Sequence, residues 1–134
     1  MEKQCELNIV TNDGKNIREN IFSLIIESIE GKLEILPNHA NSIISVIPTV
    51  TRLVDIEDKE KILFTSYGIV YIENNSIKFC CDCVNSPEEI DLERAIAEKD
   101  RAEKRLLEKK NVDIERAKEA LIRANARIET RKYS

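Results

Sequence analysis

Cysteine and histidine are the residue types in this chain that could do nucleophilic or metal chemistry. Cys80, Cys81 and Cys83 form a Cys-Cys-x-Cys cluster, and Cys5 and the single histidine, His39, are the other candidates. A tetrahedral zinc site usually takes pairs of ligands from spaced loops, and this cluster lacks that spacing. No nucleophile elbow or triad-like motif surrounds His39. We therefore predict no catalytic residue and no metal site, and interpret the thiols as small buried hydrophobic side chains.

Phosphate chemistry lacks its usual scaffold in this sequence. The three glycines, Gly14, Gly31 and Gly68, are isolated, so no glycine-rich loop can cradle a phosphate. Acidic residues in the last third mostly stand three or four positions from a lysine or arginine, which is typical of a solvated helix face. Phosphotransfer and dinucleotide chemistry therefore lack support in this sequence; a small hydrolase using His39 and a cysteine is the catalytic alternative.

Length and charge limit the architectures and the partners that this chain can have. The 134 residues are enough for one core, or for one domain with an appendage. Residues 1–87 hold 8 basic and 13 acidic residues, a net charge of −5, whereas residues 88–134 hold 13 and 12, a net charge of +1. Few aromatics and no concentrated basic patch argue against nucleic acid as the main partner. No apolar run approaches the ~20 residues of a membrane span, and the first five residues lack an apolar signal region, so we expect a cytoplasmic protein with reduced thiols.

Short apolar runs rich in isoleucine and valine dominate the chain up to residue 84. Turn residues separate them, including Asn12-Asp13-Gly14 and Asn74-Asn75, which tolerate the backbone of tight hairpins. Many short strands with turns between them predict a sandwich or barrel. The predicted strands are residues 5–11, 21–28, 33–36, 43–47, 50–56, 61–66, 69–72 and 77–84. Alternation along the last of these would place Cys81 and Cys83 on one face and Cys80 on the other.

The last third, residues 88–132, has the spacing of two helices that fold back on one another. Ser86 is expected to cap the first helix, with Pro87 at its first position, and Asp113 to cap the second. The polar stretch at 109–112 is short, so the two helices should run antiparallel. Apolar residues recur every three or four positions, as in a seam against one neighbour: Leu92, Ala95, Ala102 and Leu106, with Lys99 as a polar break, and Ile114, Ala117, Leu121, Ala124 and Ile128. Such a thin seam predicts weak pairing and a hairpin only loosely latched to the strands.

Three segments resemble the epsilon subunit of the F-type ATP synthase. Residues 31–40 (GKLEILPNHA) are similar to the family's G-x-x-x-x-L-P-N-H-A segment, although Asn41 and Ser42 follow where the family usually has Pro-Leu. Residues 91–95 (DLERA) with 101–106 (RAEKRL) resemble its first helix, and residues 117–127 (AKEALIRANAR) its second. The resemblance spans nearly the whole chain. It implies an α+β fold, with a ten-stranded β-sandwich domain (1–86) and a C-terminal antiparallel two-helix hairpin domain (87–134).

The same resemblance implies a function and partners. The chain would be a non-catalytic rotor subunit of the central stalk that couples rotation of the c-subunit ring to the catalytic head during ATP synthesis and proton transport. It would contact the gamma subunit and the c ring, lie peripherally on the cytoplasmic face of the cell membrane, and require no cofactor. The expected partner interface is the loop formed by Pro37, Asn38, His39, Ala40, Asn41 and Ser42.

Some bacterial members of this family bind ATP in the folded hairpin, through an I/L-D-x-x-R-A motif and arginines on both helices. Ile90, Asp91, Arg94 and Ala95 match the whole of the I/L-D-x-x-R-A motif. Arg101, Arg123 and Arg127 match the arginines. Guanidinium groups bind phosphate oxygens well, and a carboxylate can accept from an adenine amino group. ATP is therefore expected as a regulatory ligand, although Asn85 stands where the family site has a glutamate.

The resemblance also implies that the hairpin brakes ATP hydrolysis. When extended, it would present cationic side chains to acidic loops of the catalytic beta and alpha subunits, namely Arg105, Arg116, Arg123, Arg127 and Arg131. The non-enzymatic alternative is a cytoplasmic protein–protein adaptor, with the β-sandwich binding one partner and the coiled hairpin another.

Overall fold

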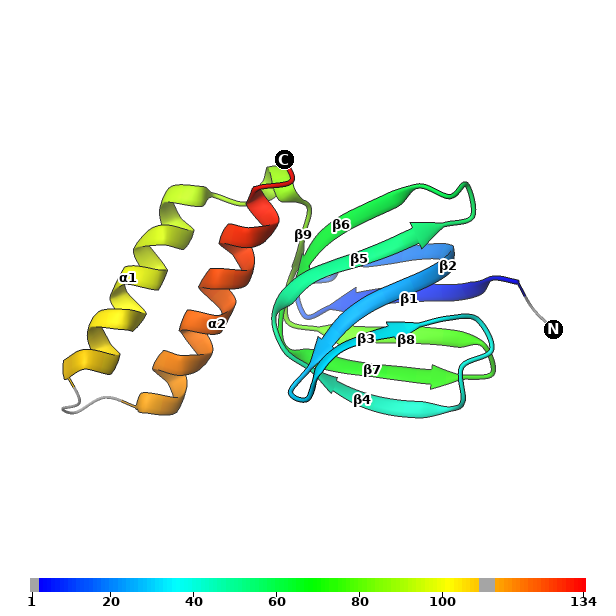
Figure 1. Cartoon of the computed structure of the whole chain (residues 1–134), viewed down its shortest axis with the longest axis horizontal. Coiled ribbons are helices and arrows are strands. Elements are labelled where there is room, and N and C mark those ends of the chain that lie inside the picture. Colours follow the sequence, from blue (N-terminus) through cyan, green and yellow to red (C-terminus); the bar gives the residue numbers. More distant parts are fainter. Residues whose placement is uncertain (1–2, 109–112) are drawn as a thin grey trace.

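A strand-rich body and a helical hairpin stand side by side in the computed structural model, which describes residues 3–108 and 113–134 (Figure 1). The expected connection between the helices, 109–112, lies outside the described residues. The elements are β1 (Cys5–Thr11), β2 (Asn16–Ser28), β3 (Gly31–Ile35), β4 (Ser42–Val46), β5 (Thr49–Asp55), β6 (Glu60–Thr65), β7 (Gly68–Glu73), β8 (Ser76–Cys81), β9 (Val84–Asn85), the 3₁₀ helix η1 (Pro87–Glu89), α1 (Leu92–Glu108) and α2 (Ile114–Arg131).

The strands pair in the order β1–β8–β7–β4–β2–β5–β6–β9, and β2 also pairs with β3 and with β1; together they wrap around one apolar core. All pairs are antiparallel except β1 with β8, which run parallel. Fully buried members of the core come from both halves of this arrangement, including Leu7, Ile21, Leu53 and Phe79. The predicted sandwich-like architecture is confirmed.

The described residues form nine strands, whereas the resemblance implies ten. Much of the difference lies in β2, which has 13 residues and begins five residues before the predicted run. Its first half pairs with β1 and its second half with β5 and β3, with a bulge between Ile21 and Ser23. Polar residues alternate along this first half, and the central apolar stretch therefore marked only the second half as a strand.

The predicted strand over residues 77–84 is too long. β8 ends at Cys81, the chain bends at Asp82, and Val84 begins the short strand β9 against β6. The alternation predicted for the cysteines is therefore wrong beyond Cys81. Cys81 lies in the main core, whereas Cys83 packs against a second apolar cluster beside the hairpin.

Turns follow the chemistry expected of them. Asn74 and Asn75 both have positive φ, 49° and 62°, as a tight primed hairpin turn requires. Gly68 at the start of β7 has a different reason to be glycine. A Cβ atom there would lie 2.2 Å from the carbonyl oxygen of Cys80, because β7 and β8 approach closely at this pair.

The linker between body and hairpin folds differently from the prediction. Pro87 opens the 3₁₀ helix η1, and α1 begins only at Leu92. Ser86 therefore precedes η1 and does not cap α1; its backbone N–H and hydroxyl both donate to the Glu89 carboxylate, at 2.8 and 3.0 Å. The cap of α1 is Asp91, whose Oδ1 accepts the N–H of Arg94 at 3.1 Å. The sequence offers two capping residues, Ser86 and Asp91, five positions apart. Only Asp91 stands directly before the continuous helical spacing of α1.

The two helices pack on one another through alanines, as predicted. Ala95 and Ala102 of α1 and Ala117 and Ala124 of α2 are all buried, and Asp113 caps α2 by accepting the N–H of Arg116 at 3.2 Å. The outer seam positions are less enclosed: Leu92 is 39% and Ile114 42% exposed. The seam is thus centred on small side chains that allow close approach of the two backbones.

Helix α2, not α1, contacts the body, along β5 and β6 and at η1 (Figure 1). The apolar part of this contact is small and consists of Phe64, Ile90 and Ala126, with Cys83 against them. At the C-terminal end of α2 the guanidinium of Arg52 lies 4.8 Å from the ring centre of Tyr133 and donates to its hydroxyl. The hairpin therefore lies on the surface of the body and is not threaded through it.

Candidate functional site

Arginines from both helices line a cavity of about 280 Å³ between α1 and α2. Helix positions four or seven apart fall on one face, so residues well separated in sequence reach the same space. Its lining includes Arg101 and Arg105 from α1 and Arg116, Arg123 and Arg127 from α2, with Glu98 as its acidic member. The sequence shows no concentrated basic patch, yet folding assembles one from arginines 26 residues apart at the extremes.

Four of these arginines have no bound acceptor. Within residues 3–108 and 113–134, the guanidinium groups of Arg101, Arg105, Arg116 and Arg123 form neither a salt bridge nor a hydrogen bond. Uncompensated like charges facing one cavity repel one another, and a polyanion would relieve that repulsion by binding bidentately to several guanidinium forks. The cavity therefore has the chemistry of an anion-binding site.

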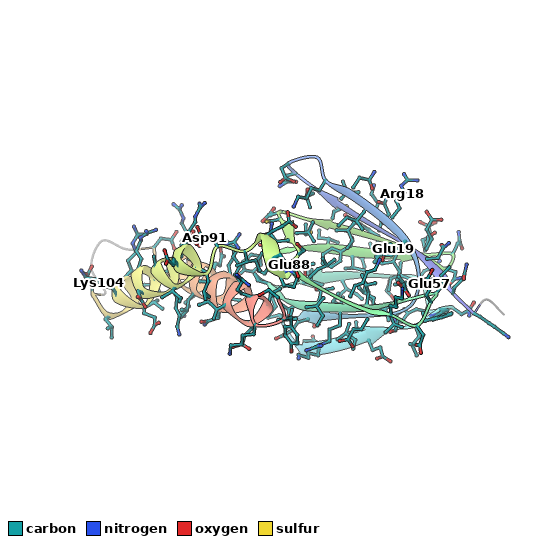
Figure 2. The ribbon with its side chains drawn as sticks, turned by 90° about the horizontal axis from the view of Figure 1, so that it is seen from above. Arg18, Glu19, Glu57, Glu88, Asp91 and Lys104 are labelled. Carbon is teal, nitrogen blue, oxygen red and sulfur yellow. The ribbon has the colours of Figure 1, made fainter. Side chains whose placement is uncertain are left out.

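A second cavity of about 240 Å³ lies at the body end of the hairpin, next to the first. Its lining includes Asn85 from β9, Glu89 from η1, and Asp91 and Arg94 at the start of α1. Glu98 and Arg127 line both cavities, so the two cavities are neighbours, and we call them together the groove. Figure 2 shows Glu88 beside the body, with Asp91 and then Lys104 farther out along the hairpin.

Arg127 stands where the two cavities meet the body. Its guanidinium lies 3.4 Å from the carboxylate of Glu98 and 4.7 Å from the ring centre of Phe64, an arrangement that combines an ion pair with a cation–π contact. It also donates to the thiol of Cys83 at 4.0 Å, and that thiol donates to Oδ1 of Asn85 at 3.2 Å. One side chain thus joins α1 and α2 to β6 and to the segment between β8 and β9.

All seven residues expected to bind ATP line this groove. Ile90, Asp91, Arg94 and Ala95 line the cavity near the body, Arg101 and Arg123 line the cavity between the helices, and Arg127 lines both. The carboxylate of Asp91 is already engaged, since it caps α1.

Sequence reasoning did not assign Glu98, Arg105 and Arg116 to this site. Arg105 follows Arg101 by four positions, and Arg116 precedes Arg123 by seven, so helical spacing is the signal that could have found them.

The predicted interface loop lies at the other end of the body, away from the hairpin (Figure 1). The β7–β8 turn holds it: the N–H of Asn38 donates to Oδ1 of Asn75 at 2.8 Å, and Oδ1 of Asn41 accepts the N–H of Asn74 at 3.1 Å. His39 contacts the carbonyl of its neighbour Ala40 at 2.8 Å, and Ser42 donates to the same carbonyl at 2.9 Å. The loop is therefore a shaped, partly exposed surface.

The histidine and the buried cysteine do not converge. Ser76, at the start of β8, lies beside the turn that holds the loop of His39. Cys81 ends the same strand five residues on, roughly 17 Å from Ser76. Burial raises the pKa of the Cys81 thiol to about 12, so it stays protonated at neutral pH. Burial also raises the pKa of Cys5. Within the described residues, no three metal-ligating side chains gather.

No helix among the described residues is both long and apolar enough to cross a membrane.

Comparison with known proteins gives matches along nearly the whole chain. Residues 4–86 match the β-sandwich domain of the ATP synthase delta/epsilon chain, and residues 88–132 match its long α-helix domain. The ATP synthase epsilon chain of Clostridium kluyveri is 43% identical over 128 residues, which cover 96% of this chain and 97% of that one. The ATP synthase epsilon chain of Clostridium novyi is 41% identical over 129 residues, covering 96% and 98%.

Two solved structures share the fold. One is a chain in the cryo-EM structure of the Euglena gracilis mitochondrial ATP synthase (OSCP/F1/c-ring), with a TM-score of 0.73, 16% identity, and coverage of 98% of this chain and 79% of that one. The other belongs to the central stalk and c-ring structure of the Tetrahymena thermophila mitochondrial ATP synthase, with a TM-score of 0.62, 14% identity, and coverage of 99% and 98%.

Proposed function

Because this chain belongs to the ATP synthase delta/epsilon family, we propose that it is the epsilon subunit of an F-type ATP synthase, a non-catalytic part of the central stalk. Identity of 43% along almost the full length of a named epsilon chain carries this proposal. In this role the subunit couples rotation of the c ring to the catalytic head. It lies peripherally on the cytoplasmic face of the membrane, in an enzyme that translocates protons.

The body and the hairpin then have separate partners. We assign the gamma subunit and the c ring to the body, with the loop at 37–42 as one contact surface, because it is partly exposed and held in shape by the β7–β8 turn. We assign the catalytic beta and alpha subunits to the hairpin in an extended state. The small apolar contact between Ala126 and the body supports a hairpin that can leave it. Residues 1–86 and 87–134 would thus move as two domains.

ATP is the ligand that we propose for the groove. Its triphosphate would bind the arginines between the helices, and its adenosine the cavity near the body. Four guanidinium groups without acceptors support the first part, and the hydrogen-bonding side chains of Asn85 and Arg94 support the second. Bound ATP would bridge α1 and α2 and so favour the folded hairpin over the extended one.

Calorimetric titration of the full chain with ATP tests the ligand. We expect saturable binding, which Arg123→Gln weakens about tenfold or more because a charge-assisted contact to phosphate is lost. Arg123 has no salt bridge or hydrogen bond among the described residues, so the variant leaves the fold intact. Arg18→Gln is the matched control, since Arg18 is exposed on β2 of the body (Figure 2). Absence of heat at millimolar ATP would exclude ATP as the ligand.

Deletion of residues 88–134 tests the brake. We expect the assembled enzyme to hydrolyse ATP faster without the hairpin, while the body, whose main core contains no hairpin residue, still assembles. The measurement is the ATPase rate of purified complexes with equal subunit content. If the rate is unchanged, the hairpin does not restrain hydrolysis.

A further inference from the structure

Glu98 is the acidic member of the cavity between the helices, and its carboxylate is already paired. It accepts from Nε of Arg94 at 3.2 Å, one helical turn earlier, and from Arg127 of the other helix at 3.4 Å. Its side chain is only 27% exposed, and that of Arg127 23%, so water screens this cross-helix pair less than it screens a fully exposed one. Glu98 therefore holds the two helices together at the point where the two cavities meet.

An anion that enters the groove meets this pair. Arg127 lines both cavities, and its carboxylate acceptor is Glu98. A phosphate oxygen that binds Arg127 has either to share its guanidinium with the Glu98 carboxylate or to displace that carboxylate. Displacement is favoured because two anions that share one guanidinium repel each other at short range. Glu98 can stay paired with Arg94 when it releases Arg127, because the pair between Arg94 and Glu98 lies within α1 and need not break.

We infer that Glu98 is an internal competitor for the anionic ligand of the groove, and that a polyphosphate binds by taking Arg127 from it. This inference rests on the proposed function for its natural ligand. In the absence of ligand, the pair between Glu98 and Arg127 replaces one of the contacts that a phosphate would make and keeps the hairpin closed. The affinity of the groove is consequently lowered by the exchange, so the site responds to high concentrations of ligand.

The test compares two neutralised carboxylates on the same helix. Glu98→Gln removes the competing charge and keeps a hydrogen-bonding side chain of the same length. Glu103→Gln removes the same charge from an exposed position whose partner is Lys99, at 4.0 Å, and Glu103 lines neither cavity. Inorganic tripolyphosphate and ATP are titrated separately into the full chains by calorimetry at low, constant ionic strength. Circular dichroism confirms that each variant retains its helices.

We expect Glu98→Gln to bind tripolyphosphate about three- to tenfold more tightly than the unmodified chain. Glu103→Gln should change the affinity by less than about twofold, and Glu98→Asp, which keeps the charge, should not gain affinity. Equal gains for Glu98→Gln and Glu103→Gln would overturn the inference, because a general change of charge would explain both.

The two proposals fail in different ways. If ATP binds and Glu98→Gln binds neither ligand more tightly, the competitor role is wrong and the proposed ATP site stands. If Glu98→Gln gains affinity for tripolyphosphate but no chain binds ATP, the competitor role stands and ATP is not the ligand. If neither ligand binds any of the chains, both proposals are wrong.

Discussion

Arg127 shows how much one side chain can connect. Its partners are Glu98 on α1, Phe64 on β6 and Cys83 between β8 and β9, which lie 29, 63 and 44 positions away along the chain. The spacing between Arg123 and Arg127 marked it as a member of a helix face, and the structure places it in the groove. Its contact with an aromatic ring of the body could not be predicted, because that contact depends on how the hairpin docks.

Gly68 is the residue at which adding a single methyl group should destabilise the body most. A Cβ atom would meet the backbone carbonyl of Cys80 at 2.2 Å, and backbone atoms cannot move aside as a side chain can. We expect Gly68→Ala to lower the free energy of unfolding by about 1–3 kcal/mol or more. Chemical denaturation of the isolated chain measures this.

Gly14→Ala is the control for that substitution. Gly14 has a φ of +93°, but a Cβ atom added there would meet nothing within 4 Å, so only backbone strain opposes alanine at this position. That strain costs about 1–2 kcal/mol. If Gly14→Ala is the more destabilising of the two, close approach of β7 and β8 is not what requires glycine at residue 68.

Elements were easier to predict than their ends. The runs at 5–11, 50–56 and 69–72 lie within one residue of strands β1, β5 and β7, because burial on alternate positions leaves a clear period. The ends of β8 and α1 were wrong, because Asp82 and Pro87 interrupt the regular backbone in ways that composition alone does not fix. The seam alanines were correct, since only small residues at that spacing allow two helices to lie close together.

The η1 segment should make the linker sensitive to acid. The carboxylate of Glu89 accepts the N–H of Ser86 and also pairs with Lys15 at 3.2 Å, and the pKa of Glu89 is lowered from 4.5, first by the Ser86 N–H and then by Lys15. A carboxyl with a lowered pKa in the folded state stabilises that state above pH 4.5, and its contribution is lost as the pH falls through the lowered value.

Glu89→Gln should therefore destabilise the chain at pH 7 and progressively less below about pH 4.5. The side chain of Glu89 is half exposed, so the difference at neutral pH should stay below about 1 kcal/mol. Thermal unfolding from pH 7 to pH 3 measures it, with Glu88→Gln, at the neighbouring exposed position, as the control. A difference from the unmodified chain that does not shrink on acidification would contradict the role given to Glu89.

At the scale of the whole molecule, the arrangement of hairpin and body carries the proposed function. The sequence predicted a strand-rich part followed by two helices, and the structure has its last strand at residues 84–85 and its first α-helix from residue 92. It did not predict the face by which α2 docks. Ala126 packs with Phe64 and Ile90 on the body side, yet it does not belong to the seam spacing. A helix with two apolar faces does not reveal from its sequence which face packs on which neighbour.

The alanines between α1 and α2 have one more consequence. Small side chains bury little apolar area, and each square ångström exposed adds only about 0.45 cal/mol/K to the heat capacity. Opening the hairpin as we propose would therefore expose little surface to water. The balance between the closed and the opened hairpin should accordingly follow a nearly straight van 't Hoff line, because the enthalpy of opening then changes little with temperature.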